Sequence, residues 1–376
     1  MLSTTDRPGN VSAGGTTVGT KHTVVSAVES PVVRWVLSKP ALGGTVTSTA
    51  TVRAAIRVGA GAFVPVTFDG QPETSFPITA SGEVVIIESD PIPVTIPAGS
   101  EVTVNVWGNS DTGGAVQVSP NTWISGVDPG YILGGQATVV DSTYSTGLLK
   151  PSMRPAAILG PGTFPSWVLT GDSITMTSNS HLERWARGTV RAAVKSAMGG
   201  EGWYHYPAVF NQRLGQVLPF GTHVLSAMGV NDVNTSAATA MQNAVSYWQQ
   251  IRSFDEIEQL IACTITPCFV SSTDGFTTLE GQTPATNNRP EVNAWLRDGA
   301  PLLSGVPSPG STDPATVRIG QAGHPVDLLA DTSSVIQDAD DTGRFRVDVG
   351  PLGGDGTHFN SAAHDLISGY LASILP

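Results

Sequence analysis

The chain carries little charge, and above all little lysine. Only 13% of its 376 residues are charged, and among its 19 basic residues only Lys21, Lys39, Lys150 and Lys195 are lysines. The formal net charge is −12. Proteins that bind nucleic acid or an anionic membrane surface neutralise phosphates with a basic patch, and no basic run occurs here. We therefore expect neither kind of partner.

Cysteine is equally scarce. Cys263 and Cys268 lie in a run that predicts a buried strand leading into a loop. We interpret both as small buried apolar side chains, since a disulfide across so short a span would bend the strand end. His181, His223 and His324 lack partners at metal-ligand spacing, so we expect no metal site.

Long apolar runs are missing as well. No segment is long enough to span a membrane, and the first ten residues lack the apolar core of a signal peptide. We therefore expect no membrane insertion. The location stays open between the cytoplasm and the outside of a cell, where the chain would be part of a virion.

Glycine (42) and proline (27) are abundant, and the first part of the chain is rich in β patterns. Residues 1–21 have almost nothing to bury, which predicts a polar arm ordered by a partner in a homo-oligomer or virion. Residues 22–150 hold short β-branched runs separated by turns such as Asp69-Gly70, which predicts a jelly-roll-like β-sandwich accessory domain. Residues 151–165 are rich in proline and predict a linker.

Residues 166–376 change to an α/β pattern. Strands are expected at 167–170, 222–228 and 258–266, and amphipathic helices at 236–251 and 361–375. Strands that alternate with helices predict a largely parallel sheet, with sites at the carboxyl ends of its strands. On the last helix, the pattern predicts a buried face of Leu366, Ile367, Tyr370, Leu371 and Ile374, with His364 at the surface.

Three polar segments follow these strands or precede the last helix. Ser173 follows the first strand and Asn231 the second, while His358 comes just before the last helix with Asp355 three residues earlier. A serine becomes a nucleophile when a base takes its proton, and a carboxylate can orient that base. The pattern therefore predicts Ser173 as nucleophile, His358 as base and Asp355 as its partner.

An oxyanion needs donors, and the sequence offers several. The Asn231 amide and the backbone N–H groups of Gly200 and Ser173 are the candidates. Structural alternatives exist for each segment taken alone, because Asp355-Gly356 is a common turn and Gly199-Gly200 common loop punctuation. We expect Asp172 to have a structural role as a buried acceptor.

These segments resemble the blocks of the SGNH hydrolases, also called GDSL esterases or lipases. Gly171-Asp-Ser173, Gly229-Val-Asn231-Asp232 and Asp355-Gly-Thr-His358 match three blocks, and Gly199-Gly200-Glu201 resembles a fourth with Glu in place of the usual Asn or Asp. The resemblance covers about residues 165–376. It implies a flavodoxin-like three-layer α/β/α domain over residues 166–376 and hydrolysis of an ester through an acyl-serine, without metal or cofactor.

The leading hypothesis is thus a serine esterase for a short-chain ester, such as an acetyl group on a carbohydrate. The alternative is a phage tail or other virion component whose esterase domain processes or recognises a cell-surface polymer. Residues 203–206, Trp-Tyr-His-Tyr, have two interpretations. They line an acyl or sugar pocket, or they form an aromatic cluster that serves only packing.

Overall fold

The computed structural model describes residues 4–5, 8–10, 16–38, 48–78, 84–110, 115–117, 130–133, 140, 155, 157–161, 165–177, 179–205, 214–340, 342–350 and 355–375. The density of internal contacts divides the chain into two compact units. The first comprises Met1–Ser166, Arg191–Ser196 and Gln212–Phe220, and the second Trp167–Val190, Ala197–Asn211 and Gly221–Pro376.

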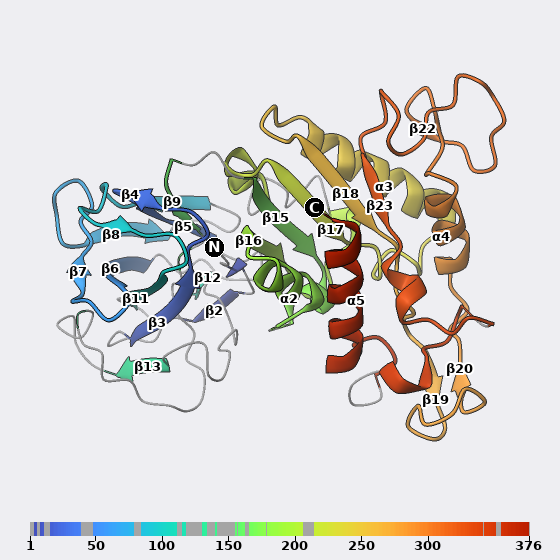
Figure 1. The fold of residues 1–376 in the computed structure, drawn as a ribbon, viewed down its shortest axis with the longest axis horizontal. Coiled ribbons are helices and arrows are strands. Elements are labelled where there is room, and N and C mark those ends of the chain that lie inside the picture. The colour runs from blue at the N-terminus through green and yellow to red at the C-terminus, as the bar shows by residue number, and fades with distance from the viewer. Residues whose placement is uncertain are drawn as a thin grey trace. The chain divides into compact units, whose positions relative to one another are not determined.

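The described elements of residues 4–159 are mainly strands (Figure 1). They are β1 Thr4–Thr5, β2 Pro8–Asn10, β3 Thr16–Thr23, β4 Val28–Glu29, β5 Val32–Ser38, β6 Ser48–Val58, β7 Val64–Pro65, β8 Thr74–Ile78, β9 Val84–Glu88, β10 Thr95–Ile96, β11 Glu101–Ser110, β12 Ala115–Gln117, β13 Gly130–Leu133 and β14 Ala157–Leu159. The first unit also contains most of β16, Ala192–Ala197, and the short 3₁₀ helices Leu214–Gln216 and Leu218–Phe220.

Two antiparallel sheets of the first unit share one hydrophobic core. In one sheet β11 pairs with β3 and β6, and in the other β5 pairs with β9 and β14. Because side chains alternate along a strand, Val102, Val104 and Val106 of β11 point into a single core that also holds Val33 and Trp35 of β5. The alternating β-branched runs of the sequence thus account for the core.

Two predicted segments of this part differ from the structure. Residues 1–21 are expected to form a polar arm ordered by a partner. The described residues of this segment instead pair within the chain itself, since β3 begins at Thr16 and pairs with β11 and β13, and β1 pairs with β16. Threonine has a high strand propensity, which outweighs the lack of apolar residues. Residues 157–159 of the predicted linker form β14, which pairs with β5. The rest of the linker lies largely outside the described residues.

The second unit is an α/β domain. Its strands are β15 Ser166–Gly171, β17 His223–Ala227, β18 Gln259–Cys263, β19 Ser271–Ser272, β20 Gln282–Thr283, β21 Leu302–Leu303, β22 Val306–Pro307 and β23 Leu328–Ala330. Its helices are α1 Ser173–Met176, α2 His181–Gly188, α3 Ala237–Arg252, α4 Arg289–Arg297 and α5 Ser361–Ile374, with 3₁₀ turns at Trp203–His205, Thr332–Val335 and Val347–Val349.

The parallel sheet predicted for this domain is confirmed. Strands β15, β17, β18 and β23 pair in this order, all parallel. Helix α2 packs against α5, and α3 packs against α4 and β18. In Figure 1, α5 lies beside α2, whereas α3 and α4 lie together to the right of the parallel strands. Helices that cover a parallel sheet leave the carboxyl ends of its strands as the place for a site.

Helix α3 follows the predicted pattern. Its N-cap is Ser236, whose hydroxyl accepts a hydrogen bond from Thr239 N–H at 3.1 Å. The predicted apolar stripe is buried, and its residues are Met241, Ala244, Val245, Trp248 and Ile251. Burial of this stripe holds α3 in place.

Helix α5 differs from the prediction in its rotation. Its buried residues are Ala363, His364, Ile367 and Leu371, while Leu366 and Ile374 are exposed. The buried stripe is displaced toward His364 because α5 packs on α2, where the His364 Nδ1 accepts a hydrogen bond from the His181 N–H at 3.1 Å. The prediction that His364 lies at the surface is therefore wrong.

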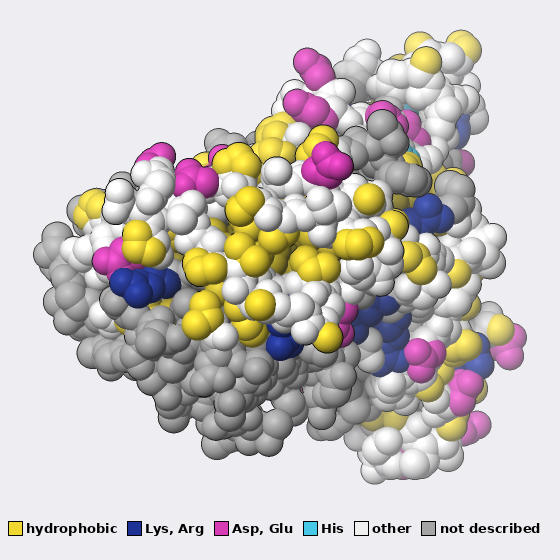
Figure 2. Space-filling view, turned by 60° about the vertical axis from the view of Figure 1, so that its left-hand side comes forward, with side chains coloured by type: hydrophobic (Ala, Val, Ile, Leu, Met, Phe, Trp, Pro, Cys, Tyr) yellow, Lys and Arg dark blue, Asp and Glu magenta, His cyan; other side chains and the backbone are white. Residues whose placement is uncertain are grey.

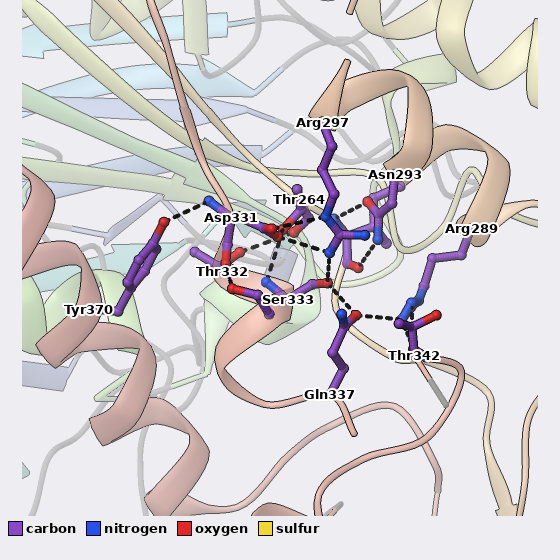
Figure 3. Close-up of polar contacts among 12 residues, drawn as sticks. Thr264, Arg289, Asn293, Arg297, Asp331, Thr332, Ser333, Gln337, Thr342 and Tyr370 are labelled. Atoms are coloured by element: carbon purple, nitrogen blue, oxygen red, sulfur yellow. Dashed lines mark hydrogen bonds and ion pairs between the residues drawn. The ribbon is translucent and has the colours of Figure 1, made fainter. Parts of the chain in front are cut away.

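A polar network lies where β18 and β23 end (Figure 3). Arg297 of α4 donates to both carboxylate oxygens of Asp331, at 2.9 and 3.0 Å, and to the Ser333 hydroxyl at 3.0 Å. Thr264, which follows β18, donates from its hydroxyl to Asp331 at 2.8 Å. The network therefore ties α4 to the ends of two parallel strands.

Many arginines pair with a nearby acid. Examples are Arg53 with Glu73 and Arg184 with Asp365. On the face in Figure 2, the described Lys and Arg side chains stand in separate small groups, with Asp and Glu among the other side chains. The described part of this face thus has no continuous basic stripe. Separately, no helix among the described residues is both long and apolar enough to cross a membrane.

We predict that Arg297→Gln lowers the free energy of unfolding by about 1 kcal/mol at neutral pH, since it removes a bidentate, partly buried ion pair. Burial raises the pKa of Asp331, but Arg297 and Thr264 outweigh it and lower that pKa below its ordinary 3.8. The ionised carboxylate therefore stabilises the fold above about pH 3.8. The difference in free energy of unfolding between wild type and variant shrinks as pH falls below this value.

Urea unfolding at about pH 7 and about pH 3 measures this difference. Arg346→Gln is the control, because Arg346 also contacts both oxygens of a carboxylate, Asp348, but in a more exposed pair. An Arg297 effect no larger than the control would contradict a structural role for the network.

Candidate active site

Ser173 stands at the sharp turn between β15 and α1. The turn is capped by Asp172, whose Oδ1 accepts a hydrogen bond from Ile174 N–H at 2.9 Å. Gly171 is required here, because a Cβ would lie 2.1 Å from the Thr175 hydroxyl and 2.9 Å from the carbonyl oxygen of Ala227. The close packing of strand and helix thus presents Ser173 at the carboxyl end of a parallel strand, as the sequence predicts.

Ser173, His358 and Asp355 form one line of hydrogen bonds. The Ser173 Oγ lies 2.8 Å from His358 Nε2, and His358 Nδ1 lies 2.6 Å from Asp355 Oδ2. An ionised carboxylate can accept but not donate, so it fixes the proton on Nδ1 and leaves the Nε2 lone pair toward Ser173. The structure therefore brings together the three residues that sequence analysis grouped.

The loop that carries the imidazole is held by Asp355 itself. Asp355 Oδ1 accepts hydrogen bonds from the N–H groups of Thr357 and His358, both at 2.9 Å. Burial raises the pKa of Asp355, but these bonds and the His358 side chain outweigh it, so the pKa lies below its ordinary value. The carboxylate therefore stays ionised near neutral pH.

A second loop packs against this one. Val270 N–H donates to the Gly356 carbonyl at 3.0 Å, and Phe269 N–H donates to the Thr357 hydroxyl at 3.0 Å. Gly356 has a φ of +69°, and a Cβ there would lie 1.8 Å from the Val270 carbonyl oxygen. Only glycine allows this contact. Nothing in the sequence indicated that the 268–270 loop touches the His358 loop.

The predicted oxyanion donors lie on neighbouring segments of the second unit. The Met198 N–H donates to the Gly171 carbonyl at 3.2 Å, which sets the start of the Gly199-Gly200 turn beside the end of β15. Gly200 has a left-handed φ of +79°. One Nδ2 hydrogen of Asn231 is donated to the Glu201 carbonyl at 2.8 Å. An Asn amide has two N–H donors, so this bond uses only one.

Two buried carboxyls lie beneath the site. Burial raises the pKa of Asp172 to about 7, against the opposing effects of the Ile174 N–H and His358. Burial also raises the pKa of Asp232 to about 6, against the hydrogen bonds from Trp203 and Tyr204. The buried Asp172, which caps α1, has the structural surroundings expected of it, whereas the role of Asp232 in holding residues 203 and 204 was missed.

The other candidate residues differ in burial. Trp203 is buried, whereas Tyr204 is exposed and Tyr206 falls outside the described residues. Cys263 and Cys268 are buried free thiols, as predicted, and burial raises the pKa of each to about 12. Within the described part of the chain, no three His, Cys, Asp or Glu side chains are grouped as metal ligands.

No protein-family model and no curated protein matches this chain. Similar solved structures include a lipase/acylhydrolase from Enterococcus faecalis, with 17% identity, a TM-score of 0.37, and coverage of 56% of this chain and 94% of that one. A family two carbohydrate esterase from Cellvibrio japonicus has 10% identity, a TM-score of 0.36 and coverage of 98% and 96%, respectively. One from Clostridium thermocellum has 14% identity, a TM-score of 0.34 and coverage of 97% and 92%.

The chain resembles the SGNH hydrolases. The resemblance rests on Ser173, Gly200, Asn231 and His358, which correspond to the Ser, Gly, Asn and His residues for which the family is named. Glu201 departs from the usual Asn or Asp of its block. It is fully buried, and its carbonyl accepts the hydrogen bond from Asn231, so the departure leaves the link between these two blocks in place.

We predict that Asp172→Asn becomes more stabilising, relative to wild type, as pH rises. The folded state binds the Asp172 proton more tightly than the unfolded state, whose pKa is near the ordinary 3.8. Wild type therefore loses stability as pH rises from about 4 to about 7, on the order of 2–4 kcal/mol at most. Asparagine keeps the oxygen that caps α1 and carries no charge.

Urea unfolding at about pH 5 and about pH 8 checks this trend. The exposed Asp255→Asn has the same change in net charge and serves as the control. A difference between wild type and Asp172→Asn that does not change with pH would show that the Asp172 carboxyl has its ordinary affinity for a proton.

Proposed function

We propose that this chain is a carboxylic ester hydrolase with Ser173 as nucleophile, His358 as general base and Asp355 as the group that orients the base. The proposal is carried by one observation, the line of hydrogen bonds from Ser173 Oγ to His358 Nε2 at 2.8 Å and from His358 Nδ1 to Asp355 Oδ2 at 2.6 Å. A serine hydroxyl needs a positioned base, and this line supplies one.

In the acylation step, Ser173 Oγ attacks the ester carbonyl carbon as its proton moves to His358 Nε2. Asp355 stabilises the imidazolium that forms. The tetrahedral intermediate then collapses, the bond to the alcohol oxygen breaks, and His358 gives its proton to that oxygen. The products of this step are the free alcohol and an acyl group on Ser173.

In the deacylation step, His358 takes a proton from water, and the resulting hydroxide attacks the acyl carbon. The second tetrahedral intermediate collapses, and the proton returns from Nε2 to Ser173 Oγ. The acid is released and the starting state restored. Both steps use only side chains of this chain and water, so the proposed reaction needs no metal or cofactor.

Each intermediate places a negative charge on the former carbonyl oxygen. We assign its stabilisation to the second N–H of the Asn231 amide and to the backbone N–H groups of Gly200 and Ser173. The Ser173 N–H is suitable because it lies in the first turn of α1, where backbone N–H groups have no acceptor within the helix. Fixed donors of this kind lower the barrier most when they bind the charged state best.

The openness of the site favours a short acyl group on a large alcohol. The side chains of His358 and Asp355 are 38% and 49% exposed, and Ser173 is half-buried. A long acyl chain gains about 0.8 kcal/mol of binding free energy for each CH₂ removed from water. Removing the whole chain from water requires an enclosed apolar tunnel. We therefore propose an acetyl or similar ester on a carbohydrate as substrate. The finer architecture that goes with this proposal is a flavodoxin-like catalytic domain preceded by a jelly-roll-like accessory domain.

We predict that Ser173→Ala and His358→Ala each lower kcat/KM for p-nitrophenyl acetate by about 10⁴-fold or more, and that the double variant is no worse than either single one. The two residues act as a unit, so once one of them is removed, removing the other lowers the activity no further. Ser373→Ala, which changes an exposed hydroxyl on α5, is the control. Wild-type turnover by the His358 variant would remove this residue from the mechanism.

We further predict that Asn231→Ala lowers kcat by about 10²–10³-fold with little change in KM, because the oxyanion forms only after the substrate has bound. Asn231→Asp has nearly the same shape but places an acceptor near the oxyanion, so it should lower kcat at least as much. Steady-state kinetics of both variants checks this. An effect confined to KM would instead mean that Asn231 binds the substrate in its ground state.

A further inference from the structure

Two exposed aromatic side chains lie on the loops that hold the proposed site. Tyr204 is 47% exposed and Phe269 is 39% exposed. Both are flanked on at least one side by a buried residue, since Trp203 precedes Tyr204 and Phe269 stands between Cys268 and Val270. Each ring therefore leaves a large part of its surface open to a ligand, although its loop neighbour is buried.

Phe269 has an unfavourable backbone conformation. Its φ is +57°, in the left-handed region that bulky side chains rarely adopt. The loop is held there by the bond from Phe269 N–H to the Thr357 hydroxyl and by the bond from Val270 N–H to the Gly356 carbonyl. Thr357 is the residue before His358. A strained residue fixed beside a proposed catalytic group points to a function for its side chain.

Tyr204 is fixed beside Asn231, which is a proposed oxyanion donor. Its N–H donates to Asp232 Oδ1 at 3.1 Å, and Asp232 follows Asn231 in the chain. Its ring packs against the His205 ring in a tilted arrangement, with centroids 3.9 Å apart and an interplanar angle of 33°. A Cβ at Gly202 would lie 2.8 Å from the ring, so the ring covers this glycine closely. The position of Tyr204 is therefore defined by the loop that Asn231 and Asp232 hold.

We propose that Tyr204 and Phe269 bind the carbohydrate part of the substrate, each by stacking on the apolar face of a sugar ring. This inference rests on the proposed esterase function. A small acyl group such as acetyl offers one methyl to bind, so most of the binding energy must come from the alcohol. Aromatic rings offer large apolar area at low entropic cost, and the two side chains would flank Asn231 and His358.

Three variants test this role. In Phe269→Gly and Tyr204→Ala, KM for an acetylated xylo-oligosaccharide should rise about 5- to 10-fold, more than KM for p-nitrophenyl acetate. Phe269→Gly should also raise Tm or leave it unchanged, because glycine suits the left-handed φ. Phe269→Tyr keeps a ring and should keep the oligosaccharide KM. Phe220→Ala is the control, because Phe220 is an exposed ring of the first unit with Arg34 above it.

The outcomes separate this inference from the proposed function. If wild type hydrolyses neither ester, the proposed function fails, and calorimetry of oligosaccharide binding then decides the inference. Weaker binding by Phe269→Gly and by Tyr204→Ala supports the inference, and unchanged binding overturns it. If wild type is active, an unchanged oligosaccharide KM overturns the inference. An equal rise in KM for the oligosaccharide and for p-nitrophenyl acetate also overturns it, since this indicates a distorted site. p-Nitrophenyl octanoate is measured beside them, and a rise in KM confined to this long-chain ester overturns the inference as well, since it indicates an acyl-binding role.

Discussion

The Asp355 carboxylate is the group on which the proposed site depends, because it holds its own loop and the base at once. Oδ1 accepts two backbone N–H groups at 2.9 Å, and Oδ2 accepts His358 Nδ1–H at 2.6 Å. Three bonds to an ionised carboxylate within four residues leave the loop little freedom. The contact between Gly356 and Val270 fixes this loop against a strand-end loop. The imidazole of His358, the proposed base, is therefore held in position by contacts within the protein itself.

The surrounding loops are held at a cost in stability. Asp172 and Asp232 are buried, and burial raises the pKa of both. Each nevertheless fixes a segment of the proposed site, since Asp172 caps the helix of Ser173 and Asp232 accepts hydrogen bonds from the N–H groups of Trp203 and Tyr204. Buried carboxyls that oppose folding but fix a site are typical of the trade-off between stability and activity. The left-handed Phe269 fits the same pattern.

Much of the second unit could be predicted from the sequence, because buried β-branched runs and amphipathic periods are local signals. These signals located the parallel strands and placed Ser173 and Asn231 at strand ends. The prediction failed for His364, because contact with α2 buries the side of α5 that carries this residue. It failed for Thr16–Thr23, where strand propensity outweighs polarity. The contact between Gly356 and Val270 joins distant segments and left no local signal.

The most direct test of the central claim is labelling with a fluorophosphonate, followed by mass spectrometry of the peptides. A fluorophosphonate reacts with a serine whose hydroxyl is activated by a base. The account predicts a single stoichiometric label on Ser173 in the wild-type protein, and almost none in His358→Ala. A label on another serine, or equal labelling of Ser173 with and without His358, would contradict it.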